Sequence, residues 1–269
     1  MDWLAPQTLE QFKALLAHNA AHREWSGLIL TGSEITLHRD LPEWVQMARR
    51  HGFEHVRIQT HGMRLAQADY CAQLIDAGVD EFFVSVAAAD AMTHDGITQV
   101  PGSFDKTLRG LELLDRHDHV TTITNTVVTS ASYTQLPLLV ERLKGFIRLA
   151  QMEFWFYFPM SEKDDKQLLA SHIDALPFLR EAISAARKLG LGLEVKNFPE
   201  CLLGDDRDVL YNDQPTLFID PAFWTEFQRN GFYQCIHRDK CAATQCLGLN
   251  SAYIEKFGQH ADLLKPFVD

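Results

Sequence analysis

The chain alternates short runs rich in β-branched and aromatic residues with longer stretches in which apolar residues recur at helical spacing. Such alternation is typical of stacked βα units around a parallel sheet. The short runs begin about 26 to 41 residues apart, close to the roughly 30 residues that one βαβ unit requires. The expected strands are 28–31, 56–60, 82–86, 122–128, 152–158 and 193–196.

Helix boundaries are legible between these runs. Thr8 followed by Gln11 has the pattern of a capping box, and Ser103 predicts the N-cap of a later helix. Helices are also expected over 41–50 and 66–77, because a glycine follows each of them where a left-handed residue ends a helix.

The βα rhythm stops after Pro199, where the chain becomes rich in polar and turn residues. We therefore expect two parts: a βα barrel over residues 1–198 and a cysteine-rich, metal-binding extension over residues 199–269. With 269 residues, of which 46% are hydrophobic, the chain can bury the core of one large domain with a small appendage.

Charge and hydropathy restrict the classes of partner that the chain is expected to bind. The 25 basic and 36 acidic residues give a net charge of -11, and nucleic acid is not expected as a partner because phosphate binding requires a basic stripe. No apolar run approaches the roughly 20 residues that span a bilayer, so no membrane role is expected. The start of the chain lacks the pattern of a signal peptide, which favours a cytoplasmic protein.

Polar residues gather after the expected strands. In parallel α/β folds the loops after the carboxyl ends of the strands form the site. Any βα turn needs polar residues, so each one alone is a weak signal, and their recurrence at successive strand ends strengthens it. The residues at these ends are Thr31, Gly32, Ser33, Glu34, Thr60, Ser85 and Asn125.

Four of the five cysteines lie in the last third of the chain, and the final three have the spacing C-x5-C-x4-C. An odd number of cysteines without a signal peptide argues against a disulfide framework. Four thiolates satisfy either an iron-sulfur cluster or tetrahedral zinc, and the lack of a C-x-x-C pair disfavours a zinc ribbon. The expected ligands are Cys201, Cys235, Cys241 and Cys246, and the alternative is a set of unconnected reduced thiols.

The stretch 30–41, LTGSEITLHRDL, resembles the glycine-glycine-glutamate-proline region of radical S-adenosylmethionine (radical SAM) enzymes. It is followed by 56–62, VRIQTHG, which is similar to the strand of that family that ends in Thr-Asn-Gly. The resemblance continues in order through 77–86 and 124–128, and it covers about residues 25–200. The cysteines of the tail are similar to the auxiliary-cluster (SPASM/twitch-like) module of the same family.

This resemblance implies a partial, open (β/α) TIM-like barrel that binds S-adenosylmethionine. Glu34 and backbone groups near Thr31 would bind the amino group of that cofactor, and Ser85 and Asn125 would contact its ribose or carboxylate. The four tail cysteines would hold an auxiliary [4Fe-4S] cluster, with zinc as the alternative metal. Glycine and proline of the family pattern are replaced here by Ser33 and Ile35, and its asparagine by His61.

The family cleaves S-adenosylmethionine with a [4Fe-4S] cluster on a C-x3-C-x2-C loop after its first strand, and the sequence contains no such motif. We therefore expect the first strand of the barrel to be missing. The strand near Leu28 would then lie at a sheet edge, covered by the N-terminal segment, a second copy or a partner chain.

Three functions are compatible with these patterns. The first is a part of a radical SAM system, either a shortened enzyme or a subunit, acting on a small-molecule or peptide substrate. The second is a non-catalytic homologue that binds a substrate or partner. The third is hydrolase or lyase chemistry with Glu34, His61, His94 or Glu153, which the absence of an H-E-x-x-H motif disfavours.

Overall fold

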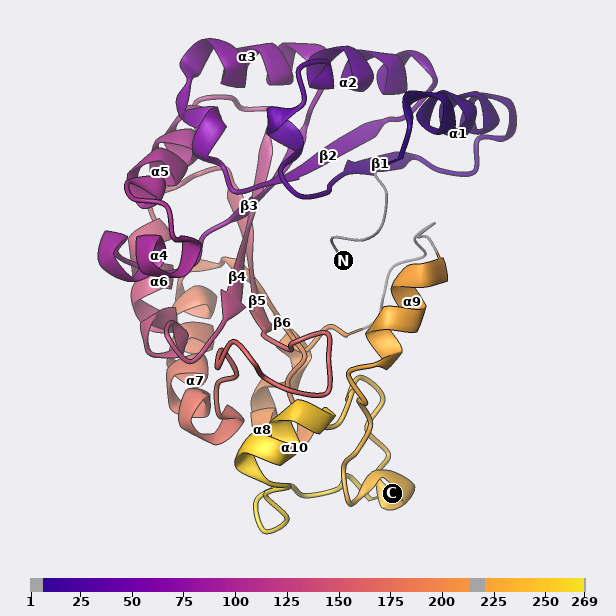
Figure 1. The fold of residues 1–269 in the computed structure, drawn as a ribbon. Helices are drawn as coiled ribbons and strands as arrows, with labels where there is room; N and C mark the ends of the chain where they lie inside the picture. Colours follow the sequence, from indigo (N-terminus) through magenta and orange to yellow (C-terminus); the bar gives the residue numbers. More distant parts are fainter. Residues whose placement is uncertain (1–6, 213–220, 269) are drawn as a thin grey trace. The chain divides into compact units, whose positions relative to one another are not determined.

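The structure is a computed structural model that describes residues 7–212 and 221–268. Its six strands form one open parallel sheet in the order β1-β2-β3-β4-β5-β6 (Figure 1). All six expected strands and the expected open α/β barrel class are thereby confirmed. The strands are β1 (Gly27–Leu30), β2 (His55–Thr60), β3 (Glu81–Ser85), β4 (Thr121–Val128), β5 (Leu149–Phe156) and β6 (Gly192–Lys196).

The register of the first four strands aligns their carboxyl ends. Leu30 pairs with Ile58, Thr60 with Val84, and Ser85 with Asn125. Since all of these pairs are parallel, the polar residues that follow or end these strands share one edge of the sheet.

Ten α-helices and five 3-10 helices lie in the described part of the chain. The α-helices are α1 (Leu9–His22), α2 (Leu41–Arg50), α3 (Ala68–Ala77), α4 (Ala91–Thr98), α5 (Ser103–Leu114), α6 (Leu136–Leu143), α7 (His172–Leu189), α8 (Glu200–Leu203), α9 (Pro221–Gln228) and α10 (Ser251–Phe257). The 3-10 helices are η1 (Ile35–Leu37), η2 (Met63–Ala66), η3 (Tyr133–Gln135), η4 (Gly204–Val209) and η5 (Arg238–Lys240).

The chain divides into two compact units. The first unit comprises residues 1–86, 90–125 and 145–151, and the second unit comprises residues 87–89, 126–144 and 152–269. In the first unit, α2, α3 and α5 cover one face of β1 to β3 (Figure 1). The division expected after residue 198 stays a prediction.

Local capping signals had mixed outcomes. The capping box is confirmed, because Thr8 Oγ1 accepts from the Gln11 N–H at 3.2 Å and Gln11 Oε1 accepts from the Thr8 N–H at 2.8 Å. The N-cap expected at Ser103 is wrong: Gly102, with a φ of 74°, precedes α5 instead. Ser103 is the first helical residue, and its hydroxyl donates to Asp95 Oδ1 at 2.8 Å.

The core of the second unit includes a buried polar contact between α7 and α10. The Tyr253 ring stacks on His172 with centroids 4.1 Å apart, and the His172 backbone N–H donates to Tyr253 Oη at 2.9 Å. Burial lowers the pKa of His172 to about 3, so its ring is neutral and packs as an apolar group. The last helix is therefore part of the core of this unit.

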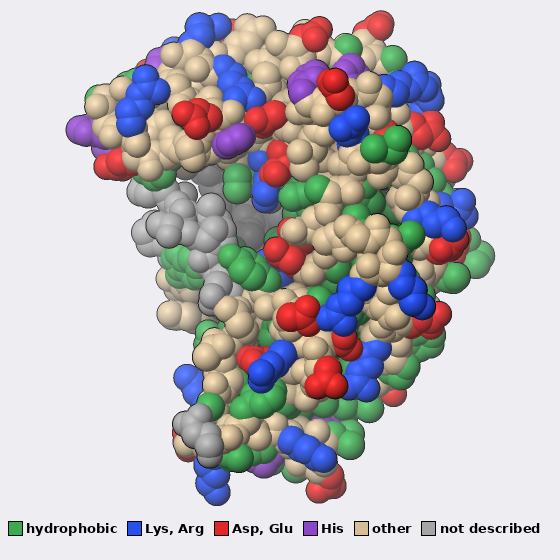
Figure 2. Space-filling view, turned by 180° about the vertical axis from the view of Figure 1, so that it is seen from behind, with side chains coloured by type: hydrophobic (Ala, Val, Ile, Leu, Met, Phe, Trp, Pro, Cys, Tyr) green, Lys and Arg blue, Asp and Glu red, His purple; other side chains and the backbone are tan. Residues whose placement is uncertain are grey.

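The surface carries both signs of charge. On the face shown in Figure 2, lysines and arginines are interspersed with aspartates and glutamates. Among the residues that the structure describes, no helix combines the length and apolarity needed to cross a membrane.

Candidate functional site

Glu34 joins the ends of the first two strands. It follows β1 and caps η1, where its Oε1 accepts from the Thr36 N–H at 3.1 Å and from the Thr36 hydroxyl at 2.5 Å. The Thr60 hydroxyl, at the end of β2, donates to the same oxygen at 2.7 Å. Oε2 accepts from the His61 N–H at 2.8 Å and lies 2.7 Å from His61 Nδ1.

These contacts set the charge of Glu34. Burial opposes ionisation, but the hydrogen bonds from Thr36, Thr60 and the His61 backbone outweigh it and lower the pKa below its ordinary value of 4.5. An ionised carboxylate offers about four acceptor sites, and five donors of the chain itself already surround this one. The side chain of Glu34 is thus engaged in holding β1 and β2 together.

The loop before Glu34 is open to solvent. Thr31, Gly32 and Ser33 are exposed, and the Thr31 hydroxyl donates to Gln59 Oε1 at 2.7 Å. Gly32 has a φ of 152°, and a Cβ added there would meet no atom within 4 Å. Open space beside this backbone fits the approach of an ammonium group, which needs oxygen acceptors.

Ser85 and Asn125 are neighbours across β3 and β4. Ser85 is exposed at the end of its strand, whereas Asn125 is only 5% exposed. Asn125 Nδ2 is buried without a hydrogen-bond partner, and so is Thr124 Oγ1. Buried donors are normally paired, so Asn125 fits a bound acceptor such as a carboxylate or hydroxyl oxygen.

Helix α5 packs directly on the loop after β2. Thr107 donates to the His61 carbonyl oxygen at 2.8 Å, and the Gly62 N–H donates to Thr60 Oγ1 at 3.0 Å. A Cβ at Gly110 would lie 2.7 Å from the Gly62 carbonyl oxygen. The close approach of α5 therefore requires glycine at this position.

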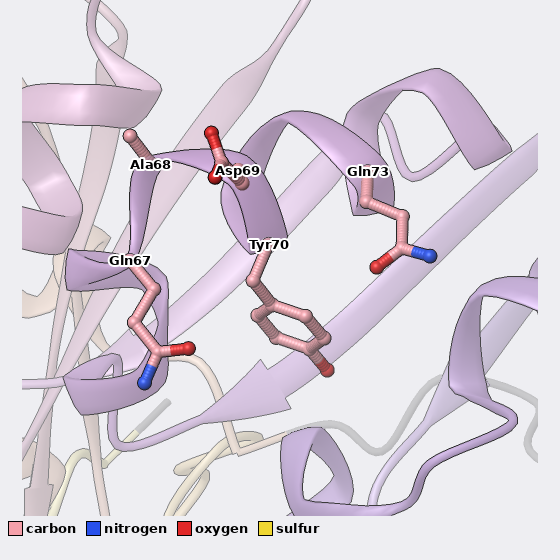
Figure 3. A pocket seen from close by; sticks show the side chains of 5 residues that line it. All are labelled: Gln67, Ala68, Asp69, Tyr70 and Gln73. Carbon is pink, nitrogen blue, oxygen red and sulfur yellow. The ribbon is translucent and has the colours of Figure 1, made fainter.

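A surface hollow of about 660 Å³ lies at the start of α3. Figure 3 shows the side chains of Gln67, Tyr70 and Gln73 projecting from the same side of α3. The Tyr70 hydroxyl donates to the Thr36 carbonyl oxygen at 2.9 Å, and the Arg64 guanidinium lies 4.0 Å from the Tyr70 ring centroid. The sequence pattern gave no signal for this hollow, because its residues lie on an ordinary helix start.

A second candidate site lies in the second unit. Cys201, Cys235, Cys241 and Cys246 line one cavity of about 330 Å³, together with side chains that include His237, Arg238 and Lys265. Cys201 belongs to α8. Cys235 precedes η5, Cys241 directly follows it, and Cys246 lies further along the same loop. The four cysteines expected to act together are thus brought to one place, and their metal ligation stays a prediction.

Backbone donors surround the sulfur atoms of this cavity. The His237 N–H donates to Cys235 Sγ at 3.4 Å, and the Gly248 N–H donates to Cys246 Sγ at 3.3 Å. Burial raises the pKa of Cys201 to about 11, against a backbone hydrogen bond from Lys265 and with a further rise from the neighbouring cysteines. Such thiols release their protons when a metal binds.

The four cysteines line one cavity, but they are not arranged there as a preformed metal site. Among the described residues, no set of three or more histidine, cysteine, aspartate or glutamate side chains is placed to hold a metal ion. Tetrahedral zinc and an iron-sulfur cluster both take thiolate ligands, so the identity of the metal stays a prediction.

The radical-generating cluster implied by the resemblance does not fit the residues present. No C-x3-C-x2-C occurs in the 269 residues. Cys71 stands alone in α3, where it is 1% exposed and burial raises its pKa to about 11. It packs as a small apolar side chain.

Together these features define an open α/β barrel protein with polar loops at its strand ends and a cavity lined by four cysteines. Residues 4–136 match the sequence model of the Radical SAM superfamily. The chain belongs to the radical SAM superfamily.

Two curated relatives share part of this region. The chain is 37% identical over 114 residues to a "Probable GTP 3',8-cyclase" of Methanopyrus kandleri, covering 42% of the chain and 36% of the relative. It is 31% identical over 138 residues to an "AdoMet-dependent heme synthase" of Methanosarcina barkeri, covering 51% of the chain and 38% of the relative. The match thus spans little more than a third of each relative.

Solved structures share the fold at low sequence identity. "Native anSMEcpe with bound AdoMet" has a TM-score of 0.56 and 16% identity, covering 69% of this chain and 53% of that one. SuiB of Streptococcus suis, bound to the precursor peptide SuiA, has a TM-score of 0.55 and 14% identity, covering 88% of this chain and 50% of that one.

Proposed function

We propose that the chain binds S-adenosylmethionine at the strand ends of the first unit and an iron-sulfur cluster in the four-cysteine cavity of the second unit. The observation that carries the proposal is the cavity itself, where four sulfur atoms separated by up to 45 residues of chain line one space. Backbone N–H groups already point at sulfur atoms there, and such hydrogen bonds tune iron-sulfur clusters.

The chain would act as one part of a radical SAM system. Its own residues do not supply the C-x3-C-x2-C cluster, so another polypeptide segment would provide it. In the described residues β1 pairs only with β2, which leaves its other edge for a strand from the N-terminal segment, a second copy or a partner chain. The named relatives support a small-molecule or peptide substrate.

Anaerobic iron and sulfide analysis tests the cluster. We expect about four irons and four sulfides per chain, as in a [4Fe-4S] cluster. Cys235→Ala should lose most of this iron because one ligand is removed. Cys71→Ala, which removes a buried cysteine outside the cavity, should retain it. Stoichiometric zinc, or equal iron in the two variants, would exclude the proposed cluster.

A non-catalytic role is the second candidate, and one observation favours it. The Glu34 carboxylate is surrounded by donors of its own chain, so backbone groups, Ser85 and Asn125 remain of the predicted contacts to S-adenosylmethionine. Equilibrium dialysis with labelled S-adenosylmethionine separates the two functions. Binding that falls at least tenfold in Asn125→Ala supports the cofactor site, whereas an iron-loaded chain that binds no S-adenosylmethionine supports the non-catalytic homologue.

A further inference from the structure

A chain of partly buried hydrogen bonds leads away from the ends of β5 and β6. The Asn197 side chain, directly after β6, donates from Nδ2 to the carbonyl oxygen of Phe156 at the end of β5 at 3.2 Å. The Asn197 backbone N–H donates to Asn212 Oδ1 at 2.8 Å. Asn212 therefore contacts the residue that follows β6 and is linked through it to the end of β5.

The same asparagine reaches the cysteine cavity. Asn212 Nδ2 donates to the Gln245 carbonyl oxygen at 2.7 Å, and its backbone N–H donates to Gln245 Oε1 at 2.8 Å. The Gln245 N–H donates to Glu200 Oε2 at 3.0 Å. Gln245 and Glu200 immediately precede Cys246 and Cys201 in the sequence, and the Glu200 backbone also donates to the Cys246 sulfur.

The bonds hold a backbone conformation that is otherwise unfavourable. Asn197 has a φ of 61°, in the left-handed region that asparagine enters more readily than most residues. Asn212 is only 8% exposed, so water does not readily replace its partners. The geometry at the end of β6 therefore depends on the same side chain that orients the Gln245 to Cys246 segment.

The segment of the cavity that carries Cys235 is held by other hydrogen bonds. Tyr233 and Gln234 donate from their backbone to the carbonyl oxygens of Leu247 and Leu249. The Gln234 side chain donates to Ser251 Oγ at 2.6 Å. None of these bonds involves Asn212, so the segment that carries Cys235 has anchors that Asn212 does not supply.

We propose that Asn212 is a positioning residue that couples the ends of β5 and β6 to the Cys201 and Cys246 side of the cavity. A group bound by these cysteines orders Asn197 and its neighbour Lys196. Lys196 Nζ donates to the Tyr211 carbonyl oxygen at 3.0 Å and lies 5.8 Å from the Trp155 ring centroid. By linkage, a ligand held at these strand ends strengthens metal binding to the same degree.

Thiol labelling of the metal-free chain tests the coupling without any cluster. Asn212→Ala removes two side-chain hydrogen bonds. The free energy that such bonds contribute corresponds to about a tenfold change, so we expect iodoacetamide to label Cys201 and Cys246 about tenfold faster than in wild type. Labelling of Cys235 and Cys241 should stay within about twofold of wild type. Gln234→Ala, beside Cys235, is the control and should leave Cys201 and Cys246 unchanged. Equal acceleration at all four cysteines, or none, overturns the proposal.

Hydrogen exchange of the iron-loaded chain tests the second step, which rests on the proposed cluster. Iron loading should slow exchange of the Asn197 amide at least threefold in wild type, and this protection should be lost in Asn212→Asp, whose carboxylate cannot donate to Gln245. Protection that persists in Asn212→Asp contradicts the coupling. A wild-type chain that takes up no iron refutes the cluster, while the labelling result still decides the role of Asn212.

Discussion

Replacing Glu34 with alanine is expected to lower the free energy of unfolding by about 2 to 4 kcal/mol. The substitution leaves the Thr36 N–H, the Thr60 hydroxyl and the His61 N–H without their acceptor. The Glu34 side chain is 10% exposed, so water replaces only part of the loss, and each unsatisfied buried donor costs about 1 to 3 kcal/mol. Chemical denaturation measures the change.

The Glu34→Gln variant separates the effect of the side chain's shape on stability from the effect of its charge. Glutamine preserves one oxygen acceptor but presents an NH₂ group toward another donor, so its cost should be about half that of alanine. Both variants should weaken S-adenosylmethionine binding, because the loop that carries Thr31 to Ser33 loses its anchor to β2. Stability equal to wild type in both variants would contradict the role of Glu34 as the link between β1 and β2.

The contribution of Glu34 to stability depends on pH in a defined direction. Since the pKa of Glu34 is lower in the folded chain than its ordinary value of 4.5, its contribution to stability is complete above that value. The contribution is lost as the pH falls from 4.5 through the lower folded pKa. The wild-type chain should therefore lose its stability advantage over Glu34→Gln across this acid range. Parallel acid profiles for the two proteins would show that the carboxylate charge contributes nothing.

The positions of the strands were predictable because alternation of apolar runs is local and repeats along the chain. The capping box at Thr8 and Gln11 was predictable for the same reason. The prediction of an N-cap at Ser103 was wrong because the Ser103 hydroxyl donates to Asp95, and the left-handed Gly102 is the N-cap of α5 instead. Neither contact has a local sequence signal.

In the candidate sites, too, contacts between residues far apart in the sequence could not be predicted. Parallel topology sufficed to place Glu34, Thr60, Ser85 and Asn125 at one sheet edge. The partners of Glu34 lie up to 27 residues away, and only the register of β1 and β2 brings His61 to it. Asn212 is a polar loop residue in the sequence, and its bonds to Gln245 span 33 residues, so its position became evident only in three dimensions.

Replacing Gly110 with alanine is expected to destabilise the first unit by about 2 to 3 kcal/mol, at the upper part of the range for overpacked positions. The new Cβ would lie 2.7 Å from the Gly62 carbonyl oxygen and 2.9 Å from Leu65 Cβ. Neither atom can move away by a side-chain rotation, so α5 must shift outward. Gly96→Ala is the matched control, since that helical glycine has no atom near its added Cβ, and it should be neutral or stabilising by up to about 1 kcal/mol.

The shift of α5 also has a functional consequence. Thr107, on the same helix, holds the His61 carbonyl oxygen, and His61 in turn contacts Glu34. Hydrogen exchange at Thr60, His61 and Gly62 should therefore accelerate at least tenfold in Gly110→Ala, and S-adenosylmethionine affinity should fall with it. Faster exchange confined to α5, with the loop unchanged, would show that α5 does not position the strand-end site. Gly110 would then be required for packing alone.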